Sequence, residues 1–373
     1  MIAPVLVFMI ALGVPLFAVI ALGALVTFRG AELEPGLFII GFIELGDHPQ
    51  LLAIVVFHVI AALLGREYLH RWGRLLSSLV NALPAGISLA WLMLASVSVL
   101  VVTCGLAMAM AVPAMLYTVS SSVVAPRQTI GADQLLIAAL IPAALAATTM
   151  ACLPGVRRRL QRIHDTVQRP VQPAGPLLWD LPMLALSLAA IVSGWLTLME
   201  TVLIALVWVL VTRPVAWREL TWKALPDSIS GAVVSSAAML LMLGLAMSWA
   251  AILHDTGVLK ALSNGFGPPF VSLAVLAVLL VTGGLVLGVQ AGLVMLAPLT
   301  IPLGLALGMA PLHLGVVSTA CLLLGRGLLP VAQAQMRNES MSAATRVLLV
   351  PAVLVVLILV SVPTLSLWLP SAI

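Results

Sequence analysis

Charged side chains are scarce in this chain of 373 residues. Only 8% of the residues are Asp, Glu, Lys or Arg, whereas 62% are hydrophobic. A soluble domain carries about 25% charged residues, so the composition excludes a soluble globular protein. The apolar runs are long and continuous and do not alternate at a period of two residues, which favours membrane-spanning helices. The sequence therefore predicts an all-α polytopic membrane protein.

Cysteine is equally sparse, and catalytic motifs are missing. The cysteines Cys104, Cys152 and Cys321 lie far apart in apolar runs, so they form no metal-binding or disulfide pattern. Core packing is the expected role of each of them. The sequence also lacks a nucleophile–base pair, an HExxH motif, a P-loop and a pair of catalytic carboxylates. It therefore predicts neither an enzyme nor a bound metal or cofactor.

Basic residues are few, and they gather in short segments between the apolar runs. They leave the chain with a net charge of +4 and a pI near 9.4. Membrane proteins concentrate Lys and Arg in cytoplasmic loops, so topology explains these residues better than a nucleic-acid partner does. The densest of these segments, 157–169, is therefore predicted to be cytoplasmic. The segments at 66–74 and 213–223 lie on the same side if an even number of crossings separates them from it, which the apolar runs allow.

The apolar runs predict a single integral membrane domain over residues 1–373, without a soluble domain or a long linker. At about 20 residues per crossing, they correspond to about 9 to 12 transmembrane or re-entrant helices. The N-terminal half (1–153) precedes a basic cytoplasmic loop (154–176) and the C-terminal half (177–373). Helices are expected at 2–26, 50–64, 84–115, 130–153, 177–211, 231–253, 270–287 and 347–369, the third and fifth being bent or paired.

Glycine, proline and serine predict several local breaks. Gly13-Val-Pro15 predicts a kink in the first helix, and Ser193-Gly194 predicts a turn within the run 177–211. The Ser120-Ser-Ser run and Pro126 predict a polar loop over 116–129. The run 2–26 is long enough to span the membrane, so it is expected to persist as a helix and not to be cleaved as a signal peptide.

Residues 284–337 combine apolar character with a glycine or proline every few residues. Each such residue loosens or removes backbone hydrogen bonds, and within a bilayer the freed groups must face protein or a water-filled cavity. Secondary transporters build their substrate and ion sites from broken helices of this kind. A packing kink explains any single break, but several breaks around one arginine favour a binding site.

Short motifs occur along the chain in an informative order. They are Gln50-Leu-Leu-Ala-Ile, Leu83-Pro84-x-Gly86, Val112-Pro-Ala-Met115, Thr197-x-x-Glu200, Arg218-Glu-Leu-Thr-Trp-Lys223, Gly308-x-x-Pro-x-His-x-Gly315, Gly325-x-x-x-x-Pro330 and Leu365-Ser-Leu-Trp-Leu-Pro370. Each motif is weak by itself. Their order and spacing, above all from Thr197 to the end, resemble the large membrane subunit of TRAP transporters, the tripartite ATP-independent periplasmic uptake systems.

This resemblance implies an inverted-repeat transporter fold with an elevator-like motion. It also implies a location in the bacterial inner membrane and the import of a small organic anion, such as a carboxylate. The expected partners are a smaller TRAP membrane subunit and a periplasmic substrate-binding protein, besides membrane lipid.

The chain departs from the family pattern at sites that hold sodium in the family. The family usually has Leu-Asp-Pro where this chain has Leu287-Gly288-Val289. It usually has Thr-Pro-Pro-x-Gly where this chain has Leu328-Leu-Pro330-Val-Ala332. The proline-rich hairpin expected between Met115 and Thr129 is also missing. These departures predict a shortened, partly degenerate first half, and they leave open whether Na⁺ is the coupling ion.

Arg326 is the most informative single residue. A charge at membrane depth costs several kcal/mol unless it faces water, a partner or a ligand. A guanidinium binds a carboxylate through two parallel hydrogen bonds, so Arg326 is a candidate for binding an anionic substrate. The alternatives are a position near the membrane interface and structural pairing with Glu200. Arg326 could also replace Na⁺ as a fixed internal cation.

Other candidates surround Arg326 in the sequence. Gln290, Gly327 and Pro330 are candidate substrate-binding residues, although Gln290 could simply be a hydrogen-bonded interior residue. The backbone carbonyls of Gly288, Gly325 and Leu329 could bind a cation, provided that the helix is unwound there.

Two hypotheses of different classes follow. The favoured one is a TRAP-type permease subunit that imports a small organic anion. The alternative is a diverged homologue that does not transport and acts as a structural or regulatory membrane subunit. A weaker third option is proton-driven or uncoupled transport with Arg326 in place of sodium.

Overall fold

The structure, a computed structural model, consists of helices throughout the residues that it describes. These are parts of 8–30 and of 43–64, and residues 110–125, 130–152, 175–216, 222–255, 269–336 and 343–372. No β-strand occurs in these residues. The expected hairpin region at 84–109, most of the basic loop at 154–176 and the motif at 83–86 lie outside them.

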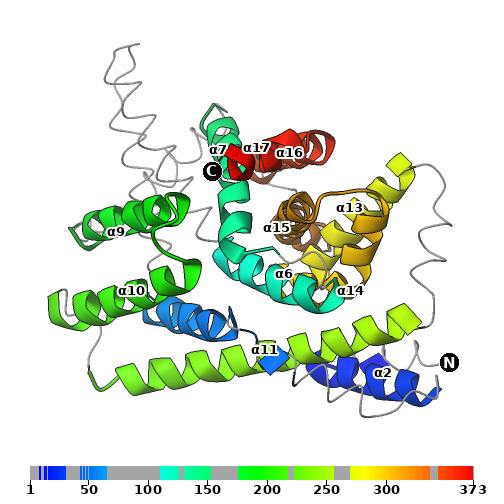
Figure 1. Cartoon of the computed structure of the whole chain (residues 1–373), viewed down its shortest axis with the longest axis horizontal. Coiled ribbons are helices and arrows are strands. Elements are labelled where there is room, and N and C mark those ends of the chain that lie inside the picture. The colour runs from blue at the N-terminus through cyan, green and yellow to red at the C-terminus, as the bar shows by residue number, and fades with distance from the viewer. Residues whose placement is uncertain are drawn as a thin grey trace. The chain divides into compact units, whose positions relative to one another are not determined.

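Figure 1 shows the helices in chain order. The N-terminal half contains α2 (Leu16–Gly30), a helix over Gln50–Leu64, α6 (Ala111–Val124) and α7 (Ala132–Cys152). The C-terminal half contains α9 (Gly175–Val192), α10 (Leu198–Val211), the π-helix η1 (Thr212–Ala216), α11 (Leu225–Asp255), α13 (Pro269–Leu287), α14 (Val289–Ala306), α15 (Pro311–Met336), α16 (Ala343–Ser361) and α17 (Thr364–Ala372). This confirms the predicted all-α fold.

Several helices are long and apolar enough to cross a membrane. They are Leu225–Met247, Val289–Ala306 and Pro311–Leu329, and α16 and α17 together pass the same test as a pair bent by 67°. The expected single helix at 347–369 is therefore two helices. Pro363 lies at their junction, and without an N–H group it cannot donate the backbone hydrogen bond that would continue the helix.

The chain divides into two compact units. The first comprises Met1–Val55, Val112–Ala132 and Ala232–Arg326, and the second comprises Val56–Ala111, Asp133–Gly231 and Gly327–Ile373. Each unit therefore draws on both halves of the sequence. The single domain over 1–373 and its division at 153 remain predictions.

In the first unit, the polar loop expected over 116–129 is wrong for most of its length. Residues up to Val124 belong to α6, and Ser120 and Ser121 are buried. The hydroxyl groups of Ser120 and Ser121 donate to the carbonyl oxygens of Leu116 and Thr118, at 2.7 and 2.9 Å. Serine hydroxyls that bond back to their own helix in this way can be buried without an external partner.

Two long-range hydrogen bonds attach α6 to other parts of the first unit. The Tyr117 hydroxyl donates to the carbonyl oxygen of Pro311 at 2.9 Å, and the Thr118 hydroxyl donates to the side-chain oxygen of Gln50. Pro311 is the first residue of α15, where its missing N–H group costs the helix nothing. α6 therefore fixes the start of α15.

Gly288 separates α13 from α14 and turns the chain back on itself. It has a φ of 84°, which glycine adopts without the strain that a Cβ would cause. Gly283 lies against α14, because a Cβ added to it would meet the Leu296 side chain at 2.4 Å. α13 and α14 thus form a tight helical hairpin, which confirms the predicted break near Gly288.

Glycine also allows α15 to approach the α13–α14 hairpin at backbone distance. A Cβ added at Gly284 would lie 2.1 Å from the carbonyl oxygen of Leu322, and one at Gly325 would lie 2.0 Å from that of Val281. No side chain fits in either place. Membrane helices associate through such small residues, because the lipid provides no hydrophobic drive between them.

We predict that Gly325→Ala and Gly327→Ala have opposite effects on stability. Within the described residues, a Cβ at Gly327 meets nothing within 4 Å, so Gly327→Ala should be neutral or stabilise helix α15 by about 0.5–1 kcal/mol. Gly325→Ala must move backbone atoms and should destabilise by at least about 1–3 kcal/mol. Thermal unfolding of the two detergent-solubilised variants measures both effects, and equal Tm values would contradict the packing.

Candidate functional site

Arg326 lies beside the close crossing of α15 and α13. It follows Gly325 directly, and a Cβ at Gly325 would also lie 2.9 Å from the backbone nitrogen of Leu285. The Arg326 side chain is exposed, and no carboxylate pairs with it within the described part of the chain. The structure therefore places Arg326, exposed and without a carboxylate partner among the described residues, one residue after the close contact of α15 with the last turns of α13, which ends at Leu287.

Gln290 lies in the first turn of α14, just after Gly288, and is partly exposed. Gly288 offers no side chain to cap this helix, and the backbone N–H of Gly292 is the one that bonds to its carbonyl oxygen, at 3.0 Å. The first N–H groups of a helix have no partner inside the helix and carry partial positive charge. The start of α14 is thus an electropositive end of the same hairpin against which Gly325 packs.

The remaining candidates lie on one continuous helix. Gly325, Gly327 and Leu329 are all part of α15, which runs without interruption from Pro311 to Met336. Their carbonyl groups could bind a cation only if the helix were unwound there. α15 has no unwound turn between Pro311 and Met336. Pro330 lies within the same helix and lacks an N–H group, so the carbonyl oxygen of Arg326 does not receive its usual backbone donor.

Glu200 caps the start of α10. Its carboxylate accepts hydrogen bonds from the backbone N–H and the hydroxyl of Thr197, at 2.8 and 2.9 Å, and the Thr197 hydroxyl in turn accepts from the Glu200 N–H. This reciprocal arrangement is a capping box. Glu200 is exposed and lies in the first turn of α10. The expected pairing with Arg326 would join residues of two separate units and stays a prediction.

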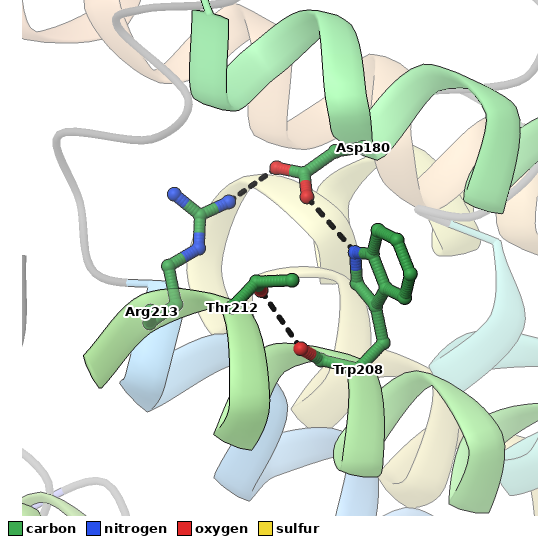
Figure 2. Close-up of polar contacts among 4 residues, drawn as sticks. All are labelled: Asp180, Trp208, Thr212 and Arg213. Carbon is green, nitrogen blue, oxygen red and sulfur yellow. Dashed lines mark hydrogen bonds and ion pairs between the residues drawn. The ribbon is translucent and has the colours of Figure 1, made fainter. Parts of the chain in front are cut away.

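A buried ion pair in the second unit was not foreseen. Figure 2 shows the carboxylate of Asp180, on α9, between Arg213 of η1 and Trp208 of α10. The Arg213 guanidinium donates to one carboxylate oxygen, and the Trp208 indole N–H donates to the other at 3.2 Å. Asp180 and Arg213 are 7% and 2% exposed, so both charges are removed from solvent.

The π-helix η1 helps to place Arg213 at this point. It follows α10 directly, and the Thr212 hydroxyl bonds back to the Trp208 carbonyl oxygen at 2.7 Å (Figure 2). Isolated π turns commonly occur at functional positions. The sequence did hold a hint, because Asp180 is the one carboxylate in the apolar run before Glu200. The sequence favours a place for Arg213 in the basic segment 213–223 between helices, whereas the structure buries its side chain.

No group of three His, Cys, Asp or Glu side chains in the described residues is placed to hold a metal ion. Cys321 is buried in α15 as a free thiol. The chemistry that the described polar residues offer is therefore binding through hydrogen bonds and charge: an arginine, an amide and an open helix start in the first unit, and a buried ion pair in the second.

The apolar helices long enough to cross a membrane, with the tight α13–α14 hairpin among them, define a polytopic helical membrane protein. More particularly, residues 95–369 match the family model of the tripartite ATP-independent periplasmic transporter, DctM component. Because this match covers most of the chain, the protein belongs to that family, whose members are the large permease components of TRAP transporters. The resemblance drawn from the sequence motifs is confirmed.

A solved structure supports the fold. The chain is similar to the Alcanivorax borkumensis YdaH transporter, whose crystal structure is described as having an unusual topology. The TM-score is 0.51 at 16% sequence identity, and the match covers 90% of this chain and 86% of that one. Identity at this level shows the fold alone. No curated protein matches the sequence.

We predict that Asp180 and Arg213 stabilise the second unit together. Removing one partner takes away the ion pair of a charge that stays buried, so Asp180→Ala or Arg213→Ala should each destabilise, by up to about 3–5 kcal/mol. The double variant Asp180→Leu/Arg213→Met removes both charges and should be markedly more stable than either single variant. Thermal unfolding in detergent measures this difference. Additive losses in an Asp180→Ala/Arg213→Ala double variant would show that the two charges do not depend on each other.

Proposed function

We propose that this protein is the large permease subunit of a TRAP-type secondary transporter and imports a small organic anion across the bacterial inner membrane. Membership of the DctM family supports the transport function, and apolar helices long enough to span a membrane support the location. The substrate class rests on Arg326, which is the single observation that carries this part of the proposal.

A carboxylate is the substrate group that best fits the surroundings of Arg326. The guanidinium is permanently charged and presents a planar set of donors that matches a carboxylate. It is exposed, and within the described residues it has no acidic partner to neutralise it. A cation at membrane depth requires a water-filled path or an anion, and an anionic substrate supplies the missing charge.

Gln290, Gly327 and Pro330 are the other residues that we propose for substrate binding. The Gln290 amide can donate to a substrate oxygen, and the uncapped first turn of α14 adds backbone N–H groups of the kind that bind anions. Gly327 is exposed and has no side chain, so a substrate can approach the α15 backbone beside Arg326. Pro330 weakens the helix by one hydrogen bond at Arg326, which gives this turn some freedom to adjust.

The proposed transport cycle includes an elevator-like motion and two partners. The elevator-like motion is proposed from membership of the family alone. TRAP systems of this family work with a small membrane subunit and a periplasmic substrate-binding protein. We expect both partners for this chain as well.

Sodium coupling has the least support in this chain, because residues that hold sodium in the family are replaced. Gly288 stands where the family usually has an aspartate, and Gly288, Gly325 and Leu329 offer only backbone carbonyls as ligands. Of these, Gly325 and Leu329 lie in continuous helix, where their carbonyls have no reason to face an ion. Proton-driven or uncoupled transport, with Arg326 as the fixed cation, accounts for this loss.

A second candidate function is a membrane subunit that no longer transports and serves a structural or regulatory role. The loss of the aspartate at Gly288 favours it, as does the shortened first half. It differs from the first proposal in a measurable way, because such a subunit would bind its membrane partner but move no substrate.

We predict that Arg326→Ala abolishes uptake of small radiolabelled carboxylates into proteoliposomes that contain the protein with its small subunit and binding protein. Arg326→Lys should retain the charge but lose the planar donor pair, so uptake should fall by about 10-fold or more. Uptake is measured as internalised radiolabelled substrate, with and without a sodium gradient.

Lys223→Ala is the matched control, because it removes one exposed positive charge at a distance in sequence from α15. It should leave uptake unchanged. Wild-type uptake that survives in Arg326→Ala would remove the arginine from the substrate site. A folded wild-type complex without uptake under any gradient would favour the non-transporting subunit.

A further inference from the structure

Helix α17 leaves α16 at an angle of 67°. The carbonyl oxygen of Pro363, which lies in the break between them, accepts the backbone N–H groups of Ser366 and Leu367, both at 3.2 Å. It also accepts the Ser366 hydroxyl at 3.0 Å. Ser366 is fully buried, so water does not compete for these hydrogen bonds. The first turn of α17 therefore holds the bend.

α16 is long enough to cross the membrane without α17. Its 19 residues span about 28 Å, close to the hydrocarbon thickness of about 30 Å. Leu354, Leu357 and Ile358 are exposed on it, as expected for a helix that contacts lipid. α17 has 9 residues and, because of the bend, advances only about 5 Å in the direction of α16. The polar layer of a bilayer is about 5–7 Å thick on each side, so α17 fits within it.

The outward face of α17 combines polar and apolar side chains around one tryptophan. Trp368 is 64% exposed, and Thr364 and Ser371, four residues before it and three after it, are also exposed. Residues at this spacing share one face of a helix. Leu365 is partly exposed and flanks Trp368 on the side away from these two hydroxyl groups. Tryptophan is enriched at the membrane–water interface, because its ring is apolar and its N–H group needs a polar partner.

We propose that α17 lies along the membrane interface and binds phospholipid headgroups through Trp368. In this position the indole ring covers the acyl chains close to the headgroups, and its N–H group donates to a lipid ester or phosphate oxygen. Leu365 faces the acyl chains, and Thr364 and Ser371 face the water. The exposed face of α16 continues through Val362, which is also exposed, so lipid reaches the point where α17 begins. α17 thereby fixes the end of α16 at one membrane surface.

Spin labels on single cysteines test this proposal. The protein, with its three native cysteines replaced by Ala, is labelled at Leu365→Cys or Ala372→Cys and reconstituted into phosphatidylcholine–phosphatidylglycerol vesicles. The two depths should differ by about 4 Å, whereas a helix that continued across the bilayer would separate them by about 10 Å. A label at Ser371→Cys should be accessible to a water-soluble nickel chelate. Leu354→Cys and Ile358→Cys, one turn apart on α16, are the matched controls and should differ by about 6 Å.

Two results would overturn the proposal. A difference of about 10 Å between the two α17 labels would make α17 part of a membrane span. Labels shielded from both dissolved oxygen and the nickel chelate would show that protein, and not lipid, covers the outward face.

A second measurement keeps the native cysteines. The fluorescence of Trp368 is obtained as the difference between the wild type and Trp368→Phe. Phospholipid brominated near the headgroup end of its acyl chains should quench this fluorescence more than phospholipid brominated near the methyl end. Stronger quenching near the methyl end, or no quenching by either lipid, would contradict the interfacial position.

Discussion

Contact between backbones is the constraint on which the first unit depends. Helices in a bilayer gain little from the hydrophobic effect, because lipid tails are as apolar as leucine. α13, α14 and α15 must therefore gain contact area by close approach, and Gly284 and Gly325 permit it by having no side chain. The same crossing fixes Arg326, which follows Gly325 by one residue. An exposed charge of this unit is thus placed next to one of its most closely packed glycines.

A second constraint comes from backbone N–H and C=O groups that have no hydrogen-bond partner within their own helix. Prolines inside α14 and α15 and the glycine at the start of α14 leave carbonyl or N–H groups that their helices do not satisfy. In soluble proteins such groups turn to water, but inside a membrane they need protein, a ligand or an internal water. Transporters can use this requirement, because the groups that need partners are also the groups that bind cargo.

The sequence predicted most of the fold, because hydrophobic length and helix breakers act locally. The α13–α14 break at Gly288, the α9–α10 turn near Gly194 and the kink near Gly13 were all expected from glycine, and each has a positive φ. The serine run in α6 predicts a loop because it is polar. This prediction is wrong, because the serine hydroxyls bond to carbonyl oxygens of their own helix. Asp180 and Arg213 were not linked, because 33 positions of chain separate them and only packing brings them together. Arg326 stood out by its charge, whereas its neighbours in space depend on tertiary contacts.

The buried Asp180–Arg213 pair also has a consequence for the synthesis of the protein. Asp and Arg each cost about 2.5–3.5 kcal/mol when a helix carrying one of them enters the bilayer alone. α9 leaves the ribosome first with its carboxylate unpaired, and its partner follows only after α10 has been made. The two helices therefore gain by entering the membrane together as a hairpin. Slow translation of α10 would leave α9 poorly inserted in the membrane. The ion pair therefore makes correct insertion depend on the order and timing of synthesis.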